Sequence, residues 1–206
     1  MKFKEELQRK LIHLSSTVYP LLYYFVDKSV TMVIVVTIFH VVLFWDLLRR
    51  KGFALPKLSF INIFLRIEEQ NCQKLCGATY FMMAVVMVIA IFPKDIAILS
   101  MLILIYSDTA AALVGKFGKI KIKSLNKTLE GFIAYIIIGI IIIVGYYKFF
   151  ATVNINFENY LIAFVALFIS GLCELFAKKL FFDDNLLVTL SYAITSYLGN
   201  YFLLFL

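Results

Sequence analysis

The sequence predicts an all-α membrane protein that crosses the bilayer about seven times. Of its 206 residues, 63% are hydrophobic and 16% are charged, and the mean hydropathy is +0.93. A soluble domain is only ~45–50% apolar, so most of this chain is expected to lie within the membrane. Its charged residues are concentrated between long apolar runs, which is typical of a polytopic protein. We expect one integral-membrane domain over residues 1–206, with no room for a separate soluble domain.

Seven apolar runs approach or reach the ~20 residues that a helix needs to cross the ~30 Å hydrocarbon core. They cover residues 11–26, 30–48, 75–92, 96–114, 129–150, 160–175 and 185–206. The first run is short and is joined to the second by a tight turn at residues 27–29, so it could be tilted or interfacial. Between the second and third runs, residues 52–74 are predicted to form an amphipathic segment along the interface.

Lysine and arginine predict the orientation, because cytoplasmic loops carry an excess of them. With alternating spans, 17 of the 20 basic residues fall on the side of the N-terminus. The N-terminus is therefore predicted to be cytoplasmic and the C-terminus external, which requires an odd number of spans. Most acidic residues fall on the same side, so a functional site is expected to open to the cytoplasm.

A carboxylate interrupts the fourth apolar run at Asp108. An ionisable group at membrane depth is costly and is a functional candidate by default. Small residues at 110–112 and at Gly115 would let a helix or ligand come close, and Gly115 with Gly118 would permit close backbone approach to an anion. Asp108 could bind Mg²⁺, or it could be a structural carboxylate paired with a lysine of a neighbouring helix.

A second polar cluster opens the fifth run, where Asn126 or Thr128 could cap the helix. A capped helix start with free N–H groups suits a phosphate, and Lys127 adds a positive charge there. The alternative is an ordinary basic flank in which Lys127 and Glu130, three residues apart, form an ion pair.

The remaining acids have simple structural interpretations. Asp183, Asp184 and Asn185 precede the seventh run, where acidic residues favour a helix start. Glu174 has Lys178 four residues on, which predicts a surface ion pair.

Two further polar residues lie at the ends of the first two runs. His13 could serve as an acid, a base or a phosphate donor, or it could be a hydrogen-bonded structural residue. Asp46, close to Arg49 and Arg50, is interpreted as part of a solvated helix end.

These pieces, in this order, resemble the CTP-dependent lipid-alcohol kinases, a family that includes dolichol kinase, phytol kinase and the CTP-using diacylglycerol kinase. The matching strings are RKLIH from Arg9, GATY from Gly77, SDTAAALVGKFGK from Ser107, KTLEG from Lys127, and CELF with DDNLLV between Cys173 and Val188. They cover almost the whole chain, and DTxA…G…KTxEG is the specific part. Ser107 stands where the family more often has glycine.

The resemblance implies Mg-assisted transfer of the γ-phosphoryl group of CTP to the hydroxyl of a membrane lipid alcohol, which could be diacylglycerol, a polyprenol such as dolichol, or phytol. It implies catalytic roles for Asp108, Glu130 and Asp184. It implies nucleotide or phosphate binding by Thr109, Lys116, Lys127, Thr128, Asn185, Arg9, Lys10 and His13. It implies metal binding by Asp108, Asp184 and Glu174. The proton of the acceptor hydroxyl could go to Glu130 or Asp184.

Two other functions are weighed against this one. Phosphatidate cytidylyltransferases look similar around DTxA…KTxEG and would transfer CMP to a lipid phosphate, but their LPGHGG and LDRxD elements are absent and DDNLLV stands at the end instead. A small transporter would need paired, discontinuous spans, and no internal repeat is found. CTP rather than ATP as the donor rests on the resemblance, since no base-binding motif is found.

Overall fold

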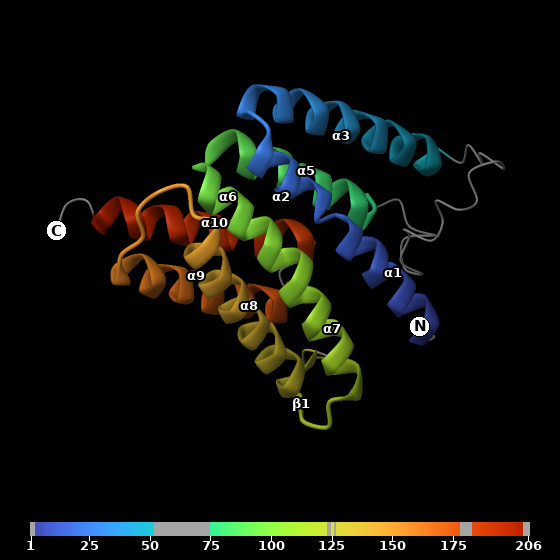
Figure 1. Ribbon diagram of the computed structural model, residues 1–206. Coiled ribbons are helices and arrows are strands. Elements are labelled where there is room, and N and C mark those ends of the chain that lie inside the picture. Colours follow the sequence, from blue (N-terminus) through green and yellow to red (C-terminus); the bar gives the residue numbers. More distant parts are fainter. Residues whose placement is uncertain (1–2, 52–74, 123–124, 126, 178–182, 204–206) are drawn as a thin grey trace.

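The computed structural model describes residues 3–51, 75–122, 125, 127–177 and 183–203, and this part of the chain forms a bundle of helices (Figure 1). The all-α prediction is confirmed, apart from a two-stranded antiparallel hairpin between the fourth and fifth apolar runs. The predicted interfacial segment 52–74, the possible cap Asn126 and the possible partner Lys178 lie outside the described residues.

The helices follow the apolar runs of the sequence. They are α1 (Phe3–Ser15), α2 (Val18–Phe25), α3 (Lys28–Arg50), α5 (Gly77–Ile91), α6 (Lys94–Leu102), the π-helical turn η2 (Ile103–Ser107), α7 (Asp108–Phe117), α8 (Leu129–Phe149), α9 (Phe157–Phe176) and α10 (Asp184–Leu203). The hairpin strands are β1 (Lys121–Ile122) and β2 (Lys127–Thr128), with Ile122 opposite Lys127.

The run α6–η2–α7 is the central element of the bundle (Figure 1). Over its apolar window 72% of the residues are buried, against 17% for α3, which packs on α5 at the edge. α6 contacts α2 and α10, whereas α7 contacts α8 and the C-terminal part of α1 reaches α7 and η2. Asp108 is therefore held at the centre of the molecule rather than facing lipid.

Within the described residues, four helical segments are long and apolar enough to cross a membrane, which supports an integral membrane protein. They are Lys28–Arg50, Lys94–Phe117, Leu129–Phe149 and Phe157–Phe176. α5 is apolar but has only 15 residues, or ~22 Å. The seven predicted spans and their orientation thus remain a prediction, although a helix occupies each run.

The first predicted span is corrected, because that run contains two short helices. The break follows Ser15, whose hydroxyl donates to the Ile12 carbonyl at 2.6 Å, and Thr17 donates in the same way to Leu14 at 2.7 Å. Such side-chain bonds compete with the helical backbone pattern and bend helices. α2 then has eight residues, or ~12 Å, and cannot cross the bilayer alone.

Asp46 is buried rather than solvated, which corrects the interpretation as a surface helix end. Its side chain is 0% exposed and accepts hydrogen bonds from Arg49 (2.7 and 2.9 Å), from the Cys76 N–H (2.7 Å) and from the Thr79 hydroxyl (2.9 Å). The last two donors belong to the start of α5. Asp46 therefore fixes the beginning of α5 against the end of α3.

Candidate active site

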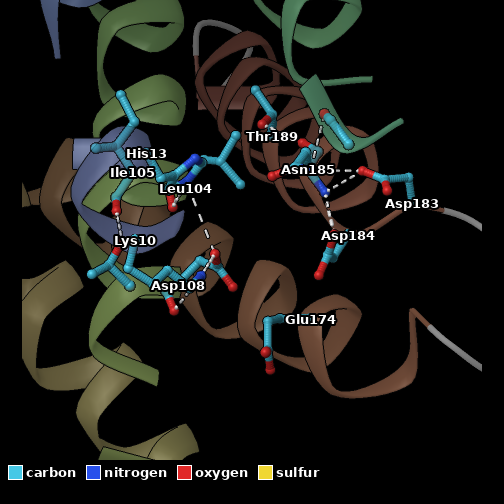
Figure 2. A network of polar contacts seen from close by, with 12 residues as sticks. Lys10, His13, Leu104, Ile105, Asp108, Glu174, Asp183, Asp184, Asn185 and Thr189 are labelled. Atoms are coloured by element: carbon cyan, nitrogen blue, oxygen red, sulfur yellow. Dashed lines mark hydrogen bonds and ion pairs between the residues drawn. The ribbon is translucent and has the colours of Figure 1, made fainter. Parts of the chain in front are cut away.

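Asp108 is the centre of the polar cluster (Figure 2). It is 7% exposed and forms an ion pair with Lys10 of α1, which is 4% exposed. His13, one turn further along α1, has its Nε2 atom 3.9 Å from the Asp108 carboxylate and 3.3 Å from the Leu104 carbonyl oxygen. A lysine of another helix does pair with Asp108, as the structural alternative expected, yet the pair faces a cavity.

The π-helical turn before Asp108 supplies part of this arrangement. π turns disturb the regular i→i+4 bonding and occur mostly at functional sites. Two carbonyls of this turn accept side-chain hydrogen bonds, Leu104 from His13 (3.3 Å) and Ile105 from Thr109 (2.6 Å). Thr109 is 4% exposed and its hydroxyl is bonded within the helix, so the phosphate contact expected of Thr109 stays a prediction.

Lys127 of β2 extends the cluster. Its Nζ atom forms an ion pair with Glu174 near the end of α9, whose side chain is 3% exposed. Burial lowers the pKa of Lys127, but the carboxylates of Glu174, Asp108 and Asp184 outweigh this effect and raise the pKa above its ordinary value. The expected Lys127–Glu130 pair and the surface position of Glu174 are thereby corrected.

Asp183, Asp184 and Asn185 begin α10 beside this cluster (Figure 2). Asp183 accepts the Asn185 backbone N–H at 3.0 Å, as expected for a helix cap, and the Asn185 side-chain amide at 2.9 Å. The same amide lies 3.3 Å from the Gly77 carbonyl oxygen of α5. Asn185 thus links α10 to α5. The negative charge of Asp184 contributes to the raised pKa of Lys127.

Thr128 and Glu130 hold the hairpin that carries Lys127. Thr128 caps α8 by accepting the Gly131 N–H (3.3 Å) and donates to the Gly115 carbonyl (3.1 Å). Glu130 accepts the backbone N–H groups of Lys119 (2.8 Å) and Ile120 (3.0 Å).

This hairpin bears on three expectations. A Cβ atom at Gly118 would meet Thr128 at 2.6 Å and Glu130 at 2.8 Å, so protein side chains fill the space expected for an anion at Gly115 and Gly118. Glu130 binds the backbone just after α7, at Lys119 and Ile120, so its carboxylate is engaged by the hairpin, and its catalytic role stays a prediction. Lys116 is exposed near the end of α7, and its phosphate contact likewise stays a prediction.

A cavity of about 170 Å³ opens next to Asp108. Charged and polar residues from three parts of the sequence line it: Arg9, Lys10, His13, Asp108 and Asn185. Its other lining residues include Ile12, Tyr19, Val42, Phe81 and Met82, with Gly77 and Ala78 at the start of α5. The structure therefore brings five predicted residues together around the cavity: Arg9, Lys10, His13, Asp108 and Asn185. Lys127 and Glu174 form a second pair, and the charge of Asp108 acts on Lys127 as well.

Comparison with known proteins decides the family. A CTP-dependent diacylglycerol kinase 1 of Schizosaccharomyces pombe is 31% identical to this chain over 155 residues, which cover 72% of this chain and 70% of that kinase. The chain belongs to the CTP-dependent diacylglycerol kinase family.

Two further relatives show similar levels of sequence identity. The enzyme of the same name from Eremothecium gossypii is 28% identical over 152 residues, and the chain spans about half of that relative, 48% of its length. An uncharacterized protein of Rickettsia prowazekii is 30% identical over 205 residues, which cover 98% of both chains. No family model matches the chain, and no solved structure matches it.

In this member of the kinase family, sequence reasoning missed the apolar wall of the cavity and the π turn. Tyr19, Val42, Phe81 and Met82 are ordinary apolar residues in helical runs, and nothing in a single sequence separates them from core or lipid-facing positions. The GATY string was a usable signal, because Gly77 and Ala78 line the cavity and Phe81 follows directly after it. The π turn has no distinct sequence pattern.

The position of Glu130 predicts a modest effect of its replacement in this diacylglycerol kinase relative. Glu130→Ala is expected to lower kcat/KM by about tenfold, since loosening the hairpin shifts Lys127 without removing a reacting group. Glu130→Gln should restore most of the activity because its amide oxygen can still accept the two N–H groups. Steady-state kinetics with both substrates checks this; a loss in Glu130→Gln as large as in Asp108→Asn would instead place the carboxylate in the chemistry.

Proposed function

We propose that this protein transfers the γ-phosphoryl group of CTP to the hydroxyl of a membrane lipid alcohol, with diacylglycerol as the first acceptor. The observation that carries the proposal is the buried Asp108–Lys10 pair on the wall of a cavity that is otherwise mainly apolar. A lipid alcohol needs an apolar wall for its chain and a charged wall for its reacting end. The printed names of the relatives supply CTP and diacylglycerol.

The nucleotide end of the site is assigned to the side of Lys127, Glu174 and Asp184. Lys127 keeps its positive charge because its pKa is raised, and it presents that charge close to Asp108. Lys10 forms an ion pair with the same carboxylate. Two cations near one carboxylate suit a polyphosphate whose terminal group must reach the cavity, because phosphoryl transfer depends chiefly on positioning and charge neutralisation.

Magnesium fits this set of donors when it arrives with the nucleotide. Within the described residues no group of three or more His, Cys, Asp or Glu side chains could enclose an ion. Mg²⁺ commonly takes one or two carboxylates and completes its shell with phosphate oxygens and water. Asp108, with Asp184 or Glu174, would hold it, and the bound ion would neutralise phosphate charge.

Residues of the chain itself are assigned to neutralise charge, to position groups and to accept the proton. Lys10 and Lys127 balance the negative charge of the phosphates, and Lys10 must also release part of its contact with Asp108 when they arrive. His13 is hydrogen-bonded to the Leu104 carbonyl and so holds α1 against the π turn on the cavity side of the site. Glu130 is occupied by the hairpin, so Asp184 is the remaining candidate of the two carboxylates for accepting the hydroxyl proton. The excess of basic residues on one side of the predicted spans supports an opening of this site to the cytoplasm.

The test uses purified full-length protein in mixed micelles with CTP labelled on either the γ- or the α-phosphate. Diacylglycerol, a polyprenol and phytol serve as acceptors, and ATP serves as the competing donor. The proposal predicts γ-label in the lipid product and none of the α-label. Transfer of the α-label to a lipid phosphate with release of pyrophosphate would establish cytidylyl transfer instead, and no label in any lipid would overturn the assignment as a lipid kinase.

A further inference from the structure

The cavity beside Asp108 changes from charged to apolar along α1 and α2 and along α5. From the N-terminus, the lining residues run from Arg9 and Lys10 of α1 to Ser16, just after α1, and then to Tyr19 of α2. On α5 they run from Gly77, whose carbonyl meets Asn185, to Phe81 and Met82 one turn further in. The two helices therefore place their polar lining at the same end.

Ring contacts connect the two ends. Phe81 meets His13 at a centroid distance of 5.5 Å and Tyr19 at 5.8 Å, so its ring lies between the charged cluster and the apolar part. Val42 precedes Asp46 by one turn of α3, and Asp46 is bonded to the first residues of α5. Val42 therefore lies deeper in the bundle than the start of α5, level with the apolar part of the cavity.

The size of the cavity limits what it can enclose. A cavity of ~150 Å³ lined by Leu, Ile and Phe binds one benzene molecule. The cavity here, about 170 Å³, thus accommodates a fragment of comparable size, together with the charged end. That is enough for the carbons next to a hydroxyl but not for a whole lipid.

The geometry points to a binding site for the hydrocarbon nearest the reacting hydroxyl of diacylglycerol, walled by Tyr19, Val42, Phe81 and Met82. The inference rests on the proposed function, and it names how the acceptor is held. A diacylglycerol has the same polarity order as the cavity, with its hydroxyl at the charged end and an acyl chain leading inward. A larger side chain in the apolar wall is then expected to weaken the binding of diacylglycerol and to leave the binding of the nucleotide unchanged.

Two adjacent valines of α3 provide a matched pair of variants. Val42 lines the cavity, whereas Val41 is 65% exposed and faces away from it. Val42→Trp is expected to raise the KM for diacylglycerol by about tenfold or more, with the KM for CTP changed less than about twofold. Val41→Trp should leave both constants close to wild type. Equal effects of the two substitutions, or a rise confined to the KM for CTP, would overturn the inference.

A second measurement does not need turnover. A diacylglycerol with a diazirine on an acyl carbon close to the glycerol is crosslinked to the full-length protein, and the labelled peptides are mapped. We expect label on the segments that carry Tyr19, Phe81 and Met82, lost in Val42→Trp and kept in Val41→Trp; Val42→Phe replaces Val42→Trp if the larger side chain prevents folding. Label elsewhere in an active protein refutes the cavity assignment alone, whereas this labelling pattern without phosphorylation refutes the kinase proposal alone.

Discussion

Asp108→Asn is expected to lower kcat by roughly 10²–10³-fold, the size typical of removing one preorganised electrostatic group from an active site. The carboxylate is the group that faces both Lys10 and the cavity, and it lies within the electrostatic field of Lys127. Asparagine keeps the shape and removes the charge. The measurement is single-turnover transfer of γ-label from CTP to diacylglycerol, and activity within a few-fold of wild type would exclude Asp108 from the chemistry.

The control for Asp108 must separate catalysis from folding. Breaking a buried ion pair from one side costs about 3–5 kcal/mol of stability because a charge is left buried without its partner. Lys10→Met together with Asp108→Asn removes both charges and should recover much of the stability, while activity stays lost. Asp95→Asn is the matched variant elsewhere, since Asp95 is 8% exposed and accepts hydrogen bonds from Tyr146 and Thr152. It should reduce the melting temperature and retain kcat.

Lys127→Ala is expected to raise the KM for CTP by about 10–100-fold, because hydrogen bonds to charged groups contribute ~1.5–3 kcal/mol each. The KM for diacylglycerol should change by less than about threefold, because Lys127 does not line the cavity. Varying each substrate at saturation with the other separates the two effects. An unchanged apparent affinity for CTP would remove Lys127 from phosphate binding.

Other lysines and the pH profile provide the controls for Lys127. Lys119 and Lys121 lie on the same hairpin and are exposed, so alanine at either position should alter the KM for CTP little. The pKa of Lys127 is raised, and a lysine with a raised pKa stays protonated to higher pH. The affinity for CTP should therefore show no loss from Lys127 between pH 6 and its ordinary pKa of ~10.4. A lysine-dependent fall in affinity near neutral pH would contradict the observed environment.

The sequence predicted the positions of the helices. Hydrophobic run length is a local property, so the positions of α3, α6–α7, α8 and α9 follow from it. The charges of Asp108, Glu174 and Asp184 all act on Lys127. The metal and phosphate roles that the resemblance implied for these residues stay predictions.

Other assignments failed because their decisive contacts join residues far apart in the chain. Asp46 stands among arginines in the sequence, yet Cys76 and Thr79, about 30 residues later, bury it. Glu130 stands three residues from Lys127, as an ion pair would require, but the backbone of Lys119 and Ile120 binds its carboxylate.

By itself, the sequence determined that the chain is a membrane bundle and that Asp108 stands where charge is costly. Composition and spacing settle this, because the free energy of placing a charge in hydrocarbon depends on the residue and its depth. Only the tertiary structure decided which partners neutralise the charges at the site, Lys10 for Asp108 and Glu174 for Lys127. It also decided that α1, α3 and α5 surround a cavity that is charged at one end and apolar at the other, since side chains from separate helices meet only after packing.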